Sequence, residues 1–185
     1  LHIRDLALAD LAAAAPPLSI SSVVNFSVVE NPNLARIVEG TVSVPNFLTT
    51  AAGSPGSRFN YTSDVVDALP SQLNGDGMVD VPFVCAIPQA AIVDAADAEV
   101  DTRAVIVGHG LYGNRYSALG FAEMAQDQNL LLCAMDWWGM SDQDLGTTFQ
   151  ILSNISFFPQ QADRLQQGFL NKILLSEAIV NGAGF

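Results

Sequence analysis

The spacing of apolar residues predicts a short helix followed by extended strands in the first half of the chain. Residues 1–15 have the apolar spacing of a helix, which two prolines close. Residues 19–30 and 35–48 are rich in β-branched and aromatic side chains and flank an Asn-Pro-Asn turn, which predicts a hairpin or two early strands of a sheet. Residues 79–88 form a third extended run that a proline ends.

The segment before this third run is rich in glycine, serine, proline and asparagine, which predicts a long surface excursion over residues 49–78. At its end, residues 74–80 resemble the middle of a calcium-binding loop. The first and twelfth positions of such a loop fall on Gln72 and Phe83, so the charged first ligand and the closing carboxylate are absent. An ordinary Asn-Gly turn is therefore preferred for Asn74–Asp80, with calcium binding as the alternative.

After residue 100 the pattern changes to alternating strands and helices. Residues 103–107 and 130–135 predict two short buried strands, and residues 116–127 between them carry helical spacing. Residues 157–182 predict a long helix with a proline in its first turn and a glycine at its C-cap. The apolar stripe of this helix is predicted at Leu165, Phe169, Ile173, Leu174 and Ile179.

Early strands followed by a strand-helix repeat favour an α/β fold whose first strands are antiparallel. We divide the chain into a β-rich N-terminal region at residues 1–100 and a βαβα segment at residues 101–185. A length of 185 residues suits one well-buried domain, and half of the residues are hydrophobic. No apolar stretch is long enough to predict a transmembrane helix.

Charge narrows the classes of partner. The chain has 7 basic and 19 acidic residues, a formal net charge of −12 and a pI near 4.1. Nucleic acid and anionic membranes are therefore not expected as partners, because neither would meet a basic surface. An acidic chain with a single lysine, Lys172, suits a secreted or cell-envelope protein, or one from a salty habitat.

One glycine-rich stretch, VIVGHGLYGNRY at residues 105–116, fits two kinds of chemistry. Gly108, Gly110 and Gly113 satisfy G-x-G-x-x-G, the pattern that binds the pyrophosphate of a dinucleotide at the start of a helix. The next predicted strand ends at Asp136, where a ribose-binding carboxylate would lie. An NAD(P)-binding oxidoreductase is therefore one hypothesis.

Three features oppose the dinucleotide hypothesis. About a hundred β-rich residues precede the loop, whereas this pattern usually opens its domain. The side chains of His109 and Tyr112 add bulk where phosphates need space, and Trp137 and Trp138 directly follow the supposed ribose carboxylate. A G-x-G-x-x-G spacing on its own is weak evidence.

The same loop resembles the oxyanion loop of the α/β-hydrolase superfamily, and bacterial lipases and esterases with a His-Gly-Leu loop are the nearest likeness. The resemblance implies that the backbone N–H of Leu111 helps to hold the oxyanion of the tetrahedral intermediate. It further implies that His109, Gly110 and Tyr112 shape the loop, with the histidine ordering it rather than abstracting a proton. No cofactor is implied.

The exit of the second buried strand, DWWGMS at residues 136–141, also resembles that superfamily. The resemblance covers roughly residues 80–185 and implies that Asp136 braces the loop instead of serving as the triad acid. Trp137 and Trp138 are candidates for lining an acyl or aromatic substrate pocket. Packing under a cap is an equally weighted alternative for these tryptophans.

The hydrolase fold also implies an order of strands. Residues 79–88 would lie beside residues 130–135, with residues 103–107 on the far side of the latter. Cys85 and Cys133 would then be on neighbouring strands and able to touch. Two buried free thiols are preferred here over a disulfide.

The nucleophile that this chemistry requires is missing from the chain. No Gly-x-Ser-x-Gly pentapeptide is present, and Gly139-Met-Ser141-Asp-Gln143 is the nearest match, after the wrong strand. The only histidines are His2 and His109. We therefore expect the N-terminal portion of a serine ester hydrolase, whose open sheet edge is covered by the rest of the polypeptide or by a second chain. A noncatalytic interaction domain of similar fold is the alternative.

Overall fold

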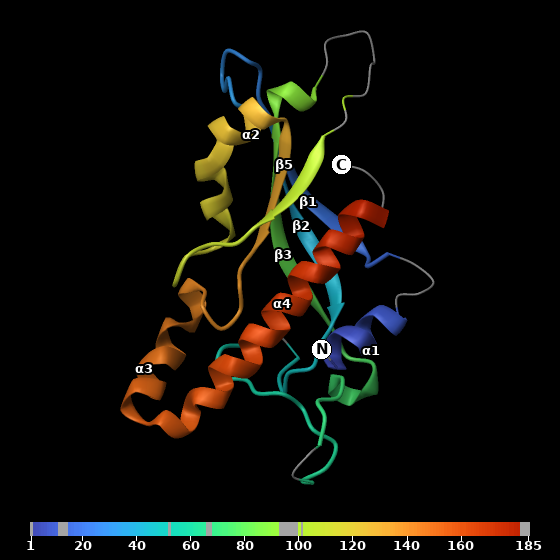
Figure 1. Cartoon of the computed structure of the whole chain (residues 1–185), viewed down its shortest axis with the longest axis vertical. Coiled ribbons are helices and arrows are strands. Elements are labelled where there is room, and N and C mark those ends of the chain that lie inside the picture. Colours follow the sequence, from blue (N-terminus) through green and yellow to red (C-terminus); the bar gives the residue numbers. More distant parts are fainter. Residues whose placement is uncertain are drawn as a thin grey trace.

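The computed structural model of the chain combines a mixed β-sheet with helices (Figure 1). The residues that it describes are 2–10, 15–51, 53–65, 68–92, 100 and 102–181. The helices are α1 (His2–Asp10), α2 (Ala122–Gln128), α3 (Leu145–Ser153) and α4 (Phe158–Asn181). The strands are β1 (Leu18–Asn25), β2 (Leu34–Pro45), β3 (Met78–Pro88), β4 (Arg103–Val107) and β5 (Leu130–Met135). Short 3₁₀ segments are η1 (Leu73–Gly75), η2 (Gln89–Ala91), η3 (Arg115–Phe121), η4 (Asp142–Asp144) and η5 (Ile155–Phe157).

The described strands form one sheet in the order β1-β2-β3-β5-β4. β1, β2 and β3 pair antiparallel in sequence order, and β3 pairs antiparallel with β5. β4 pairs parallel with β5 on the side away from β3. The sheet therefore confirms an α/β fold with antiparallel early strands, and it confirms the predicted neighbours of residues 79–88, 103–107 and 130–135.

Helices cover both faces of the sheet (Figure 1). On one face, α1 and α4 pack with side chains such as Val38 and Cys85 in the main hydrophobic core. On the other face, η3 and α2 pack against Val84, Ala86 and Leu132. This division follows from the alternation of side chains along β3, since successive residues of a strand point to opposite faces.

The strand β4 differs from its prediction as a buried strand. Its first three residues, including Val105, are exposed, because β4 pairs with β5 on one side alone and forms the edge of the described sheet. Its apolar composition is that of an interior strand, but its neighbours within the described residues leave it open.

The helix α4 confirms the predicted element and only part of the predicted stripe: Leu174 lies in the main core and Ile179 packs against it. Phe169 is exposed, and the buried face of the helix includes charged and amide side chains. These polar groups hold the excursion and the residues just before it, so the excursion is less superficial than predicted. Asp163 accepts from the backbone N–H of Phe59 in the excursion (3.0 Å), and Gln167 Oε1 accepts from the N–H of Phe47 before it (3.0 Å). Buried amides of an irregular segment require such partners, which hydrophobic spacing does not reveal.

The end of the excursion is a tight turn, as the sequence predicts. Asn74 and Gly75 have left-handed backbone angles, with φ of 55° and 85°. Such angles suit asparagine and glycine better than other residues. Among the described residues, no group of three or more His, Cys, Asp or Glu side chains gathers as a metal site would need. None of the described helices is long and apolar enough to cross a membrane.

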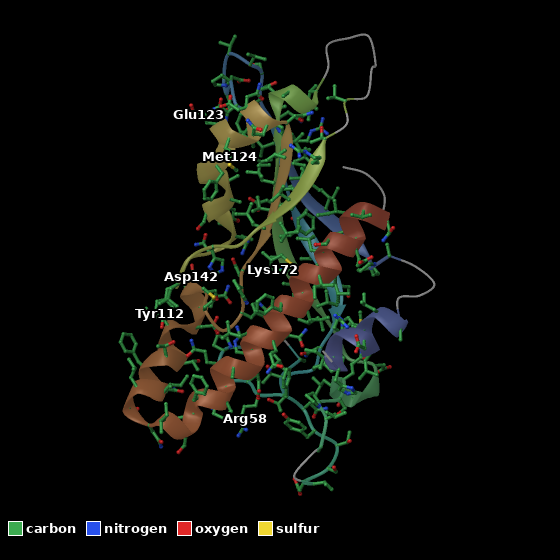
Figure 2. All side chains as sticks on the ribbon, in the orientation of Figure 1. Arg58, Tyr112, Glu123, Met124, Asp142 and Lys172 are labelled. Carbon is green, nitrogen blue, oxygen red and sulfur yellow. A yellow bond between two sulfur atoms is a disulfide. The ribbon has the colours of Figure 1, made fainter. Side chains whose placement is uncertain are left out.

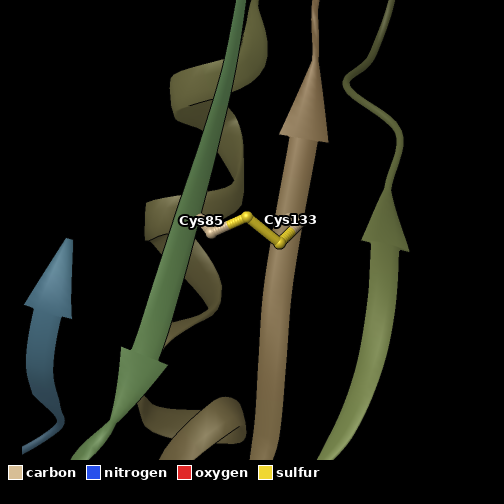
Figure 3. Close-up of a disulfide and its surroundings, with 2 residues drawn as sticks. All are labelled: Cys85 and Cys133. Atoms are coloured by element: carbon tan, nitrogen blue, oxygen red, sulfur yellow. A yellow bond between two sulfur atoms is a disulfide. The ribbon is translucent and has the colours of Figure 1, made fainter. Parts of the chain in front are cut away.

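The preference for free thiols is wrong: Cys85 and Cys133 form a disulfide (Figure 3). The two cysteines lie directly opposite each other in the register of β3 and β5, with their Cα atoms 4.1 Å apart. Both are fully buried in the main core. The bond therefore joins the antiparallel part of the sheet to its parallel part.

We predict that loss of this disulfide lowers the free energy of unfolding by about 2–4 kcal/mol, because the bond restricts the unfolded chain. Urea unfolding of Cys85→Ala/Cys133→Ala against the native chain measures the effect. Thiol titration of the denatured, unreduced chain is the control. Two reactive thiols in that titration would contradict the bond.

Candidate functional site

The loop that follows β4, here called the His-Gly loop (residues 108–114), lies where β4 and β5 end. Its histidine is 6% exposed and has both ring nitrogens occupied. His109 Nε2 lies 2.7 Å from the Trp137 amide nitrogen and accepts its proton, while Nδ1 lies 2.7 Å from the Gly110 carbonyl oxygen. Because Nε2 accepts, Nδ1 carries the hydrogen and donates it. The ring therefore fastens the loop to the exit of β5 and has no free lone pair for proton abstraction.

The next residues of the loop form a strained turn. Tyr112 has a φ of 56°, which is uncommon for a bulky side chain. Two hydrogen bonds hold it there: the Tyr112 N–H donates to the Met140 carbonyl (2.7 Å), and the Gly113 N–H donates to the Gly110 carbonyl (3.0 Å). Backbone strain of this kind persists where surrounding contacts determine the conformation, and it is concentrated at functional sites.

The turn leaves the Leu111 amide without a hydrogen-bond acceptor among the described residues. The Leu111 side chain is 65% exposed. A carbon added at Gly110 would meet no atom within 4 Å, so the space beside this amide is open. A fixed, unsatisfied N–H beside open space can donate to an incoming oxygen without reorganising.

Asp136 ties the far end of the His-Gly loop to β5. Its carboxylate accepts from the backbone N–H of Arg115 (2.8 Å) and from the Arg115 guanidinium (2.7 Å). Gln143 adds a longer hydrogen bond at 3.3 Å. Asp136 is almost fully buried, so the arginine also neutralises its charge. The carboxylate braces the loop in the way that the sequence resemblance implies.

A second carboxylate, Asp144, organises the turn after Asp136. Asp144 Oδ2 accepts from the N–H of Gly139 (2.8 Å) and from the N–H and the hydroxyl of Ser141 (3.2 and 2.7 Å). Its other oxygen, Oδ1, accepts from Arg164 Nε at 2.7 Å. Arg164 also donates to the carbonyl of Gly53, so one guanidinium joins α4, the excursion and this turn.

This arrangement decides the role of Ser141, the nearest match to a nucleophile. Ser141 has no exposed surface, and its hydroxyl donates to a carboxylate that is already shared with an arginine. A nucleophilic serine needs access to substrate and a general base. Ser141 is therefore a structural residue of the turn.

We predict that Arg164→Leu lowers the free energy of unfolding by about 3–5 kcal/mol, because it leaves the buried Asp144 carboxylate without its charge partner. Urea unfolding followed by circular dichroism measures this. Arg4→Leu, which breaks the exposed Arg4–Asp5 pair, is the matched control and should change stability by less than about 1 kcal/mol. Equal effects of the two substitutions would contradict a special role for the buried pair.

The two tryptophans of the DWWGMS stretch lie in different surroundings. Trp138 is buried under Arg164, whose guanidinium carbon is 5.0 Å from the ring centroid. Trp138 also lines, with Asp136 and other residues, a cavity of about 300 Å³; its remaining lining residues are Gly53, Ser54, Pro55, Asp80, Pro82 and Gln143. Trp138 thus both packs and borders a small polar cavity.

Trp137 is half-buried between the His-Gly loop and α4. Its ring meets Phe169 edge-to-face at 4.6 Å, and Lys172 Nζ lies 4.1 Å from its centroid. α4 comes this close because residue 168 is glycine: an added carbon there would lie 2.8 Å from the Trp137 ring. Trp137 therefore links α4 to the loop: its ring packs against α4, and its backbone N–H donates to His109.

Lys172 is a half-buried ammonium group that forms no ion pair with the described residues. Burial lowers the pKa of Lys172 from its ordinary 10.5 to about 8. The ammonium stands next to Gly108, where an added carbon would lie 3.4 Å from Nζ. The chain thus places a positive charge, its sole lysine, at the base of the His-Gly loop. Figure 2 shows Lys172 on α4, on the side that faces the sheet.

We predict that the free energy of unfolding gains a pH-dependent contribution from Lys172 between about pH 8 and 10.5. In this window the unfolded lysine keeps a proton that the folded lysine has released, so rising pH favours the folded state. Lys172→Met should lose this contribution, and Arg4→Met, which removes an exposed charge, should keep it. Denaturation midpoints measured across the window test the difference, and parallel curves for all three proteins would contradict it.

The geometry also bears on the dinucleotide hypothesis. The amides of Tyr112 and Gly113, which would have to cradle a pyrophosphate, already donate within the protein. The segment after the loop begins as 3₁₀ at Arg115, and its first turn is capped by the side chain of Asn114. A phosphate site at an α-helix N-terminus needs free N–H groups there. The G-x-G-x-x-G spacing is thus present, but the backbone N–H groups of Tyr112 and Gly113 that would bind a pyrophosphate are already engaged.

Several residues of this site were not identified from the sequence. They are Arg115, Asp144, Arg164 and Lys172. Each contacts a partner on another segment of the chain: Arg115 binds Asp136, Arg164 binds Asp144, and Lys172 lies over Trp137. Asp144 alone had a local signal, because Ser141-Asp-Gln-Asp144 has the spacing of a capping box, which the structure contains. No protein-family model, curated protein or solved structure matches this chain.

Proposed function

We propose that the chain is the leading portion of a serine carboxylic-ester hydrolase with the α/β-hydrolase fold. In this proposal it contributes the oxyanion loop of an esterase, lipase or polyester hydrolase. The nucleophilic serine and its triad partners come from residues downstream or from another chain. The observation that carries the proposal is the Leu111 N–H, which donates to none of the described residues and lies in a loop whose histidine has both ring nitrogens engaged.

The chemistry follows from the developing charge. When a serine attacks an ester carbonyl, the carbonyl oxygen becomes an oxyanion that needs positioned donors. The Leu111 N–H is such a donor, and the hydrogen bonds of His109 and Tyr112 keep it in place before the substrate arrives. Removal of one donor of this kind costs about 10²–10³-fold in kcat in serine hydrolases.

The sheet order supports the same proposal. β3, β5 and β4 have the order and directions that the resemblance implies for the second, fourth and third strands of the hydrolase sheet. In that sheet the strand before the nucleophile would pair with the open edge of β4. We infer that this edge is where the remainder of the polypeptide, or a second chain, binds.

We propose a secreted or cell-envelope location, in a bacterium if the likeness to bacterial lipases holds, and the buried disulfide supports the location because disulfides persist mainly in oxidising compartments. The acidic surface is in keeping with this inference. An exported ester hydrolase would meet lipid or polymer esters outside the cytoplasm, which is the substrate class that we propose.

The test of the catalytic proposal uses the gene that encodes this chain. Its whole protein product should react covalently with a fluorophosphonate probe, at a serine within a Gly-x-Ser-x-Gly sequence beyond Phe185. The same product should hydrolyse p-nitrophenyl esters. A product with neither labelling nor hydrolysis, or one that binds NAD(H) in a fluorescence titration, would overturn the hydrolase assignment.

A pair of substitutions tests the oxyanion donor itself. Leu111→Pro removes the N–H and should lower kcat by about 10²–10³-fold, whereas Leu111→Ala keeps the N–H and should retain most of it. Circular dichroism and fluorophosphonate labelling of both variants show whether the fold and the nucleophile survive. Equal kcat values for two folded variants would exclude Leu111 as the donor.

A further inference from the structure

The helix α3 presents its more apolar face to solvent. Leu145, Phe149 and Leu152 lie on one stripe at spacings of four and three residues, and Phe149 and Leu152 are 63% and 77% exposed. The buried face contributes Thr147 and Ile151. A helix of a globular protein normally turns its apolar stripe toward the core. The outward stripe of α3 is therefore not explained by the packing of the described residues.

The apolar surface continues beyond α3 into the next segments. Ile155 and Phe157 of η5 and Phe158 at the start of α4 are also exposed. Contiguous exposed apolar patches of this kind are uncommon on soluble proteins and mark binding surfaces. We call this set the α3–η5 apolar surface; it consists of Leu145, Phe149, Leu152, Ile155, Phe157 and Phe158.

The α3–η5 apolar surface is also free of charge. Between Asp144 and Asp163 the sequence has no charged residue, although the whole chain has a net charge of −12. The exposed residues between the apolar ones are uncharged, such as Gln150, Ser153 and Asn154. Such a surface pairs with a partner that offers neither positive nor negative charge.

The surface lies at the same end of the sheet as the His-Gly loop (Figure 1). The backbone joins the two: the Asp142 N–H donates to the Gly113 carbonyl (3.0 Å), and Gly113 and Ser141 form a parallel bridge. Figure 2 shows Tyr112 and Asp142 close together beside the end at which α3 begins. Anything bound to the α3–η5 apolar surface would therefore approach the loop.

We propose that the α3–η5 apolar surface adsorbs to an uncharged lipid–water interface. Leucine, isoleucine and phenylalanine side chains gain free energy on leaving water for an acyl layer, and the interleaved amides and hydroxyls remain hydrated at its boundary. An anionic membrane is disfavoured, because the surface has no lysine or arginine and the chain is strongly acidic. A second copy of the chain is disfavoured because two copies would bring together two charges of −12.

This inference does not depend on the proposed ester hydrolysis, because adsorption requires neither a nucleophile nor an oxyanion. A chain that adsorbs without belonging to a hydrolase would leave the adsorption proposal intact. A hydrolase whose α3–η5 apolar surface does not adsorb would overturn the adsorption proposal alone.

The experiment measures co-flotation of the 185-residue chain with vesicles. Vesicles of zwitterionic phosphatidylcholine are compared with vesicles that contain anionic phosphatidylglycerol at low salt. Phe149→Ser/Leu152→Ser removes two side chains of the surface. Val28→Ser/Val29→Ser removes two apolar side chains from the β1–β2 turn that are at least as exposed in fraction, and it is the control. Circular dichroism checks that each variant is folded.

The native chain and the control variant should float with phosphatidylcholine vesicles and bind more weakly to the anionic ones. The Phe149→Ser/Leu152→Ser variant should bind phosphatidylcholine at least about tenfold more weakly. Equal binding of both variants, or no binding by the native chain, would overturn the proposal. Light scattering that shows a dimer, abolished by Phe149→Ser/Leu152→Ser but not by the control, would assign the surface to a protein contact instead.

Discussion

The buried ion pair between Arg164 and Asp144 holds together the parts on which the site depends. Arg164 joins α4 to the carbonyl of Gly53 in the excursion and to the carboxylate that organises the turn after β5. An ion pair without solvent is stable only when its hydrogen bonds are nearly complete, and Asp144 here accepts from two amides and a hydroxyl as well. The geometry of this turn then determines the His-Gly loop, because Met140 supplies the carbonyl that holds Tyr112.

The His-Gly loop is therefore held in place by hydrogen bonds from other segments, although its own sequence is rich in glycine. Three contacts from outside fix the loop and the residue directly after it: the Trp137 N–H to His109, the Asp136 carboxylate to Arg115, and the Met140 carbonyl to Tyr112. Trp137, Asp136 and Met140 all follow β5 in the chain. The segment after β5 therefore determines the conformation of the loop after its parallel neighbour, β4. The disulfide and the pairing of β3 with β5 hold β5 in the middle of the sheet. This is the kind of preorganisation that an amide donor requires if it is to stabilise a charge that appears during a reaction.

The elements that sequence analysis located correctly are those whose signals are local. Runs rich in β-branched and aromatic residues, bounded by turns or a proline, located β1, β2 and β3, and a helical period with a first-turn proline located α4. The burial of Gln167 and Asp163 was missed, because their partners are backbone amides more than a hundred residues earlier in the chain. The helix α3 was missed as well, because its nine residues include two threonines and a glycine, which are weak helix formers. The two thiols were misjudged because oxidation depends on register, and register is a property of paired strands.

For the candidate site, the sequence by itself determined where the loop lies after a strand, the glycines that permit its turn, and Leu111 as the residue that follows Gly110 in it. It also determined the acidic charge and the absence of a Gly-x-Ser-x-Gly pentapeptide within these residues. Only the tertiary structure decided that His109 is engaged at both nitrogens, that Ser141 is buried, and that Lys172 stands beside Gly108. The physical reason is that a residue type sets which hydrogen bonds a group can make. Which of them it makes depends on groups that folding brings from distant parts of the chain.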